Sequence, residues 1–351
     1  MITYLSFMKD VLPPKEWYKV NRFVNELKTA YVPPVVSVYT PPREIDRVIR
    51  ILEETERVPE VEEVETAIER ELDSLRGSVG SICMFGWRAG EVVLKHLITS
   101  GDVPPVYVVD AKPFFEPLHD ILEIQYDMLL ILLDQKKALL KLYKGGEVQR
   151  QKRIKSYVGA KHHKGGWSQK RFSRIRETQV RNHLNRVQEY LGRFDLKSIE
   201  RIILAGSGNA KKDFARGHLI KELADKAVLV KGLDFSSSDE EIDAMLVDQL
   251  DKHRKAVESR QLSRVRERMP KGLALTENRE IQRALESGAV ETILIASDYY
   301  AATPEEDERI IRMIEEAEHT SAEVEFITDE RVLEELHKHG SVVASLRYRP
   351  F

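Results

Sequence analysis

Residues 150–176 carry the strongest chemical signal in this chain. They contain ten lysine or arginine residues and no aspartate or glutamate, although the whole chain has a formal net charge of −3. A charge concentrated in this way favours binding to a polyanion such as RNA. Gly165 and Gly166 lie inside the segment, and residues without a Cβ let the backbone approach a ligand closely. A solvated basic loop is the alternative interpretation.

The residues around these glycines resemble a known motif. The motif is Gly165-Gly166-Trp167-Ser168-Gln169 followed by Arg171-Phe172-Ser173-Arg174-Ile175-Arg176-Glu177. It resembles the middle-domain loop of archaeal and eukaryotic class-1 peptide-chain release factors, which reads Gly-Gly-Gln and then Ser-x-x-Arg-Phe-x-Arg-x-Arg. Weaker similarities follow the order of the same family at residues 36–42, 203–214, 288–291 and 340–348. The resemblance therefore covers nearly the whole chain.

One departure from the motif concerns its glutamine. Trp167 occupies the place of that glutamine, and the nearest glutamine is Gln169. A Gly-Gly-Trp-Ser-Gln form is similar to a divergent branch of the family, the valosin-containing-protein-associated mitochondrial stress responder hydrolases and their prokaryotic relatives. In that branch a shifted glutamine is retained.

The resemblance implies hydrolysis of the ester that joins a peptide to tRNA. Such a protein must position water and stabilise the developing oxyanion. Gly165 and Gly166 suit the approach, Gln169 is favoured for the side-chain role, and Trp167 is expected to stack on a base. The alternative is that Trp167 donates a backbone N–H in place of the family's glutamine, with its indole stacked on an exposed base. The expected phosphate-binding cations are Lys161, Lys164, Lys170, Arg171, Arg174 and Arg176.

A second departure lies near the N-terminus. The family's stop-codon loop, an Asn-Ile-Lys-Ser tip, has no counterpart here, and residues 53–73 contain ten acidic residues in its place. The cysteine-bearing decoding motif near Tyr107 is degraded, because Val109 stands where cysteine is expected; Asp110 and Phe114 remain close by. RNA phosphates repel an acidic tip, which argues against reading a codon. An ordinary solvated helix face explains the acidic run equally well.

The hydrophobic pattern predicts three domains of α/β class. Residues 1–124 alternate strands at 35–40, 81–87 and 106–110 with helices at 43–56 and 60–76 and form an α+β domain. Residues 125–265 begin with strands at 127–134, 137–143 and 147–154, followed by a helix at 171–193, a strand at 199–206, a helix at 210–223, a strand at 226–231 and a helix at 238–262. This order predicts a mixed sheet covered by helices, RNase H-like by resemblance.

The third predicted domain spans residues 272–351, after a linker at 264–272. Its strands at 290–297, 322–328 and 341–348 alternate with helices, which predicts a three-layer α/β domain that resembles the ribosomal-protein-like C-terminal domain of the family.

In the long helix of the middle domain, Phe172, Ile175, Val187 and Leu191 are expected to face the core.

Several features argue against other classes of site. Cys83 is the only cysteine, which excludes a disulfide and a cysteine-bound zinc and predicts a buried thiol. Gly206-Ser207-Gly208 follows a strand but lacks the third glycine of a dinucleotide motif, so we expect a tight turn capped by Ser207 and Asn209. His162 and His163 have no metal-ligating partner nearby. We therefore expect no cofactor and no metal.

The favoured function is a ribosome-associated peptidyl-tRNA hydrolase that acts without a stop codon, in ribosome rescue or quality control. Its expected partners are ribosomal RNA and peptidyl-tRNA, with a translational GTPase or a ribosome-recycling ATPase at the C-terminal domain. No apolar run is long enough for a membrane helix. We expect the protein to be cytoplasmic and a monomer. Two alternatives remain: a non-catalytic ribosome-binding regulator, and a tRNA-cleaving nuclease that uses His162 or His163 as a base.

Overall fold

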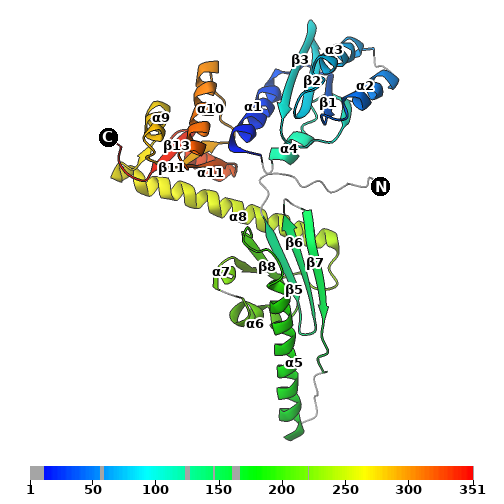
Figure 1. Ribbon diagram of the computed structural model, residues 1–351, viewed down its shortest axis with the longest axis vertical. Helices are drawn as coiled ribbons and strands as arrows, with labels where there is room; N and C mark the ends of the chain where they lie inside the picture. Colours follow the sequence, from blue (N-terminus) through cyan, green and yellow to red (C-terminus); the bar gives the residue numbers. More distant parts are fainter. Residues whose placement is uncertain are drawn as a thin grey trace. The chain divides into compact units, whose positions relative to one another are not determined.

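The computed structural model describes residues 12–55, 59–122, 127–144, 147–159, 167–219 and 221–350, without the side chains of residues 147 and 167–170 (Figure 1). The chain forms two compact units. One lies within Ile124–Lys252, and the other combines Lys9–Glu123 with His253–Phe351. Among the described residues, no helix combines the length and the apolar character needed to cross a membrane.

The N-terminal region is built on a four-stranded antiparallel sheet. Its strands are β1 (Val35–Thr40), β2 (Ser81–Ala89), β3 (Glu91–Thr99) and β4 (Val106–Asp110), in the order β3-β2-β1-β4. Helices α2 (Ile45–Glu54) and α3 (Glu62–Ser74) pack on one face, and α1 (Pro14–Ala30) packs on the other. The predicted strands and both predicted helices are confirmed, whereas β3, α1 and α4 (Glu116–Leu122) were not predicted.

The middle region contains a five-stranded mixed sheet. Its strands are β5 (Met128–Leu133), β6 (Lys137–Lys144), β7 (Glu147–Lys155), β8 (Arg201–Ala205) and β9 (Ala227–Leu229), in the order β7-β6-β5-β8-β9. The β5–β6–β7 part is antiparallel, while β8 and β9 run parallel to β5. The mixed sheet expected for this region is therefore confirmed.

Helices cover both faces of this middle sheet, and each face has its own core. Helices α5 (Trp167–Leu191) and α6 (Ala210–Gly217) pack on one face, with α7 (Lys221–Ala224) at its edge. The first turns of α8 (Asp239–Arg268) pack on the other face through Ile242 and Leu246. The alternation of apolar side chains along β5 and β8 supplies both cores, because successive residues point to opposite faces.

The C-terminal region is a three-layer α/β structure, as expected. Strands β10 (Ala274–Leu275), β11 (Val290–Ala296), β12 (Glu323–Ile327) and β13 (Val342–Leu346) pair in the order β10-β13-β11-β12. Helices α9 (Asn278–Glu286) and α10 (Pro304–His319) cover one face. Helix α11 (Glu330–His337) and the last turns of α8 cover the other.

The linker expected at residues 264–272 is wrong. Helix α8 continues to Arg268, and a 3₁₀ turn (Met269–Lys271) follows it. The helix persists because Leu262 and Val265 are buried against the C-terminal sheet, and the 3₁₀ turn after it ends where Gly272 adopts a left-handed φ of 64°. The two compact units divide inside α8, between Lys252 and His253.

Helix α1 joins the N-terminal and C-terminal regions into one unit. The Trp17 ring stacks on Phe326 of β12 with 3.9 Å between ring centroids. Asp307 of α10 accepts a hydrogen bond from Tyr18 Oη at 3.0 Å and pairs with Arg22. Asn25 Nδ2 donates to the Ser297 carbonyl oxygen at 3.0 Å. These contacts explain why residues predicted to form two separate domains share one core.

Candidate nucleic-acid interface

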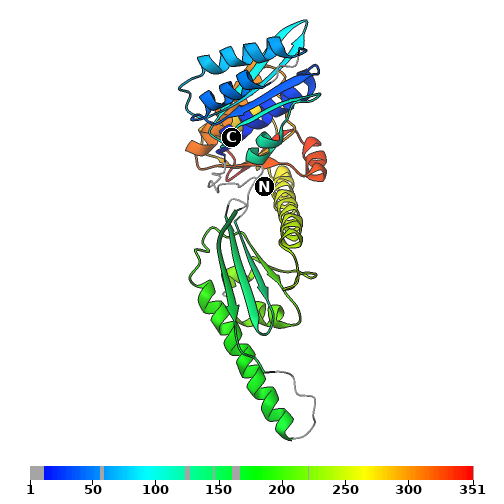
Figure 2. The same cartoon turned by 90° about the vertical axis from the view of Figure 1, so that its right-hand side faces the viewer.

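The basic segment begins on the edge strand β7 and continues into α5. Figures 1 and 2 show α5 extending past the end of the middle sheet, so its first turns have no sheet to cover. Arg171 and Arg174 are exposed there, and Phe172 and Ile175 are 48% and 44% exposed. The expectation that Phe172 and Ile175 face the core is wrong. Val187 and Leu191, which lie over the sheet, are buried as expected.

Three hydrogen bonds fix the chain where it leaves β7. Gly159 N donates to Gln179 Oε1 at 2.9 Å, and Arg176 Nε donates to the Gly159 carbonyl oxygen at 3.3 Å. The same guanidinium donates to Gln135 in the turn between β5 and β6. Arg176, one of the predicted phosphate ligands, thus holds Gly159 and the β5–β6 turn against α5. Its phosphate-binding role stays a prediction.

A buried histidine of α5 contacts the chain just after β7. His183 of α5 is fully buried, and its Nδ1 lies 2.8 Å from Ser156 Oγ. Burial lowers the pKa of His183 below its ordinary value, because a charged imidazolium would lose its hydration. The neutral ring therefore belongs to the folded state, and it anchors Ser156 at the end of β7.

The predicted catalytic tip straddles the start of α5. Gly165 and Gly166, with Lys161, Lys164 and both histidines at 162 and 163, lie outside the described residues. The backbone of Trp167, Gln169 and Lys170 is helical, so α5 begins one turn earlier than predicted. The first four N–H groups of an α-helix have no acceptor within the helix, and they carry the positive end of its dipole. The tip motif therefore ends at a helix N-terminus.

The glycine turn after β8 has a structural explanation. Gly206 has a φ of +121°, and a Cβ at this position would lie 1.9 Å from the Leu133 carbonyl oxygen. Lys211 Nζ donates to the Val230 carbonyl oxygen at 2.7 Å in a buried position, and burial lowers its pKa. The tight turn is confirmed, but the Asn209 side chain makes no capping hydrogen bond at the start of α6. Asn209 does not cap the helix because its own backbone is already helical.

The acidic region near the N-terminus is mostly an exposed helix face. In α3, Val64, Ile68 and Leu72 are buried at helical spacing, as expected. Glu65 differs, because it is only 1% exposed and accepts a hydrogen bond from Tyr107 of β4. Cys83 is buried, as the sequence predicted.

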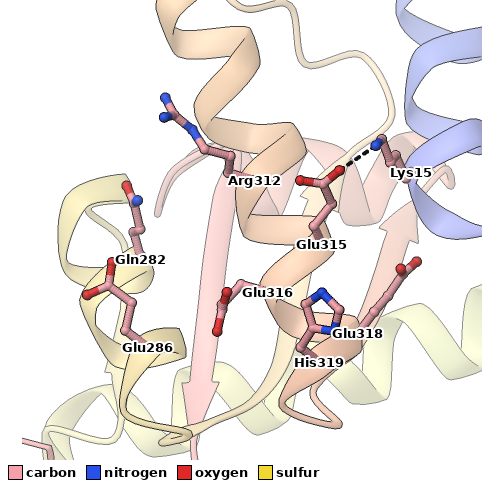
Figure 3. A pocket seen from close by; sticks show the side chains of 8 residues that line it. All are labelled: Lys15, Gln282, Glu286, Arg312, Glu315, Glu316, Glu318 and His319. Carbon is pink, nitrogen blue, oxygen red and sulfur yellow. Dashed lines mark hydrogen bonds and ion pairs between the residues drawn. The ribbon is translucent and has the colours of Figure 1, made fainter.

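One hollow in the second unit is lined mainly by acidic side chains. It has a volume of about 540 Å³ and lies between α9 and α10 beside the start of α1 (Figure 3). Lys15 of α1 pairs with Glu315 of α10 at its edge. Its remaining lining side chains are Gln282, Glu286, Arg312, Glu316, Glu318 and His319. Among the described residues, no group of histidine, cysteine and acidic side chains could hold a metal ion.

Comparison with known families relates two consecutive parts of the chain to release factors. Residues 127–257 match the family described as Actinobacteria/chloroflexi VLRF1 release factor, and residues 255–350 match eRF1 domain 3. The first of these matches contains the basic segment and the whole of α5.

Two curated relatives are both named peptide chain release factor subunit 1. The chain is 30% identical over 203 residues to peptide chain release factor subunit 1 of Methanopyrus kandleri, covering 55% of this chain and 48% of that protein. It is 30% identical over 213 residues to the protein of the same name from Pyrococcus abyssi, covering 56% and 51%. The chain thus spans about half the length of these relatives.

Solved structures show a likeness in fold. S. cerevisiae Dom34, titled a translation termination-like factor involved in RNA quality control pathways and interacting with Hbs1, matches with a TM-score of 0.50 at 13% identity, covering 76% of this chain and 80% of that one. The archaeal translation termination factor aRF1 matches with a TM-score of 0.38 at 20% identity, covering 95% and 98%.

Proposed function

We propose that this chain, whose residues 127–350 match release-factor families, is a ribosome-associated peptidyl-tRNA hydrolase that acts without a stop codon in ribosome rescue or quality control. The observation that carries the proposal is the construction of the basic segment. Its cations are exposed at the start of α5, while Arg176, Gln179 and His183 hold the base of the loop.

The proposed chemistry is attack of water on the ester carbonyl of peptidyl-tRNA. The water oxygen bonds to the carbonyl carbon, the ester C–O bond breaks, and the tRNA 3′-terminal hydroxyl leaves with a proton. Gly165 and Gly166 would let the backbone reach the ester, and Gln169 would orient the water. The N–H groups at the start of α5 offer donors for the oxyanion.

The surrounding cations would hold RNA. Arg171 and Arg174 are exposed and have no carboxylate partner among the described residues, so they are free to contact phosphates. Lys161, Lys164 and Lys170 are proposed for the same role. Trp167 is proposed to stack on an unpaired base, as aromatic side chains do in single-stranded RNA recognition.

Codon independence follows from the N-terminal region. Residues 53–73 contain ten acidic residues where the release-factor family carries its stop-codon tip, and exposed carboxylates repel RNA phosphates. With Trp167 in the place of the family glutamine, we place the chain in a Gly-Gly-Trp-Ser-Gln branch similar to the mitochondrial stress responder hydrolases. The C-terminal region, which matches eRF1 domain 3, would bind a translational GTPase or a recycling ATPase in the cytoplasm.

The test is peptide release from purified ribosomes that carry peptidyl-tRNA. We expect Gly165→Ala and Gly166→Ala to lower the release rate by about 100-fold, because a tip misplaced by about 1 Å costs that much. Gly217→Ala is the matched control, since a Cβ there meets nothing within 4 Å.

Three outcomes would contradict the proposal. Absence of peptide release by the wild-type chain would favour the non-catalytic regulator, and release at the wild-type rate by both glycine variants would mean that Gly165 and Gly166 are not the catalytic tip. A tRNA product shortened at its 3′ end would favour the nuclease, because ester hydrolysis leaves the tRNA intact.

A further inference from the structure

A hollow of about 380 Å³ lies on the face of the middle sheet opposite α5. Strands β6 and β7 form its floor, and the segment leading into α8 forms its wall. Leu139 of β6 belongs to the core beneath α8, which identifies the face. The hollow shares no residue with the segment 159–176, and its lining side chains include Lys137, Arg153, Lys155, Phe235 and Ser237.

Three cations lie close together in this hollow, and their mutual repulsion destabilises the fold when no anion is bound. Lys137 and Lys155 are direct cross-strand partners, and Arg153 pairs with Leu139 two residues along. All three therefore project to the α8 face of the sheet. Like charges placed directly opposite one another destabilise a sheet. None of the three forms an ion pair with a carboxylate among the described residues, so a ligand that supplies negative charge would relieve the repulsion.

The two aspartates that also line the hollow are already engaged. Asp239 pairs with Lys141 at 2.8 Å, and the Lys141 hydrogen bond, with a smaller contribution from Arg153, holds the pKa of Asp239 below its ordinary value. Asp234 accepts hydrogen bonds from Ser236 N at 2.7 Å and from Ser236 Oγ at 2.5 Å. Asp239 is neutralised by Lys141, whereas Asp234 keeps its charge because Ser236 is neutral, so the three cations exceed the remaining negative charge by two.

An exposed aromatic ring supplies a flat apolar surface beside the cations. Phe235 is 36% exposed, and Lys137 Nζ lies 5.7 Å from its ring centroid. A ring of this kind next to phosphate-binding cations is the arrangement by which proteins hold a base and its backbone phosphate. Ser237 Oγ accepts from Asp234 N at 3.1 Å, and its own hydroxyl hydrogen is available to a ligand.

We propose that this hollow binds one nucleotide of single-stranded RNA, with its base on Phe235 and its phosphate between Arg153 and Lys155. The inference rests on the proposed function for the source of the RNA. It adds a second RNA-binding surface on the face of the middle sheet that α5 does not cover.

Strand β7 offers a matched pair of variants to test this site. Arg153→Ala with Lys155→Ala removes two cations from the hollow. Arg150→Ala with Lys152→Ala removes two from the other face, where these side chains lie over Phe194 and Tyr190. The full chain is titrated into a fluorescein-labelled, unstructured oligoadenylate, and binding is followed by anisotropy at several salt concentrations.

We expect the hollow variant to bind about tenfold more weakly, with a log–log salt slope lower by about 0.7 for each phosphate that is no longer bound. Phe235→Leu should bind about fivefold more weakly with an unchanged slope, because only stacking is removed. An equal decrease in the Arg150/Lys152 variant would overturn the site and leave only a general basic surface. Adenosine monophosphate competing as well as the oligonucleotide would overturn RNA as the ligand in favour of a free nucleotide.

Peptide release by the wild-type chain, measured beside oligonucleotide binding by both β7 variants, separates this inference from the proposed function. Specific weakening of oligonucleotide binding, in a protein whose wild-type form releases no peptide, would support the hollow and contradict the hydrolase. Release with no difference between the two β7 variants in binding would do the opposite.

Discussion

Basic side chains have different partners in the two compact units. In the unit formed by the N- and C-terminal regions, Arg268 pairs with Glu291, which Arg264 also contacts at 2.6 Å. In the middle unit, Arg171 and Arg174 are exposed without a carboxylate partner among the described residues. The same residue type therefore stabilises structure in one unit and remains available for a ligand in the other. A net charge of −3 hides this division.

The hollows of the two units repeat the contrast. The hollow between α9 and α10 has four glutamates against two cations, whereas the hollow beside β7 has three cations against two aspartates, one of which is paired with Lys141. RNA would be repelled by the first and attracted by the second. We infer that the middle unit is the RNA-binding part of the chain.

The largest effect should be the loss of stability that follows when an ion pair with a structural role is broken. Asp307 has an 8% exposed side chain, accepts from Tyr18 and pairs with Arg22. Asp307→Asn should lower the free energy of unfolding of its unit by about 3 kcal/mol, because it leaves a partly buried arginine unpaired. Trp17 and Trp87 fluorescence in urea, measured in a Trp167→Phe background, reports this unit.

The exposed partner pair in the same unit is the control for Asp307. Glu315→Gln removes the partner of Lys15 at the surface and should cost less than about 1 kcal/mol. RNA affinity should stay at the wild-type value in both variants. Equal decreases in stability would mean that burial does not distinguish the two pairs.

An intermediate effect should come from removing charge that serves binding. Arg171→Ala with Arg174→Ala should weaken ribosome binding about tenfold and lower the log–log salt slope by about 0.7 to 0.9 for each phosphate that is no longer neutralised. Unfolding should not change, because neither side chain has a carboxylate partner among the described residues. Arg266→Ala, which breaks an exposed pair with Glu335 at 2.9 Å, is the control and should leave binding unchanged. Salt-independent binding by the wild-type chain would contradict the contrast.

The smallest effect should be the change in stability with pH that His183 causes. The pKa of His183 is lowered by burial and by the nearby Arg186, while Asp134 and a hydrogen bond with Lys137 oppose this. The unfolded chain therefore binds more protons than the folded one below about pH 6.5, so stability is full above that pH and falls as the pH drops through the window beneath it.

His183→Asn tests this assignment. Asparagine can keep the hydrogen bond to Ser156 Oγ and cannot be protonated. We expect its urea midpoint, followed by circular dichroism, to fall less than that of the wild-type chain between pH 7.5 and pH 5.5. An identical fall in both proteins would assign the pH dependence to other groups.

Local patterns in the sequence predicted most strands and the three sheets, but not how far a helix remains buried. The helical spacing of Phe172 and Ile175 is compatible with the same buried stripe as Val187 and Leu191, yet only the second pair lies over the sheet. Helix α1 carried a recognisable signal in Trp17, Val20, Val24 and Leu27, which our sequence interpretation missed. Without this helix, the N-terminal and C-terminal regions were predicted as separate domains, although they share a core.

Roles that depend on distant partners could not be predicted from the sequence. The basic segment and its glycines were recognisable from composition and motif alone. The charge of Arg176 predicts a phosphate ligand, but its hydrogen bond to Gln135, 41 residues away, could not be predicted because only the fold brings the two residues together. The hollow beside β7 likewise requires the register that places Lys137 opposite Lys155.

The most direct test of the central claim compares codons. Release is measured on ribosomes that carry the same peptidyl-tRNA with a stop codon, a sense codon or no codon in the A site. Because the proposed RNA-binding charge lies in the middle unit and the N-terminal region presents an acidic face, the rates should agree within a few fold. A strong preference for the stop codon would contradict the account and indicate ordinary termination.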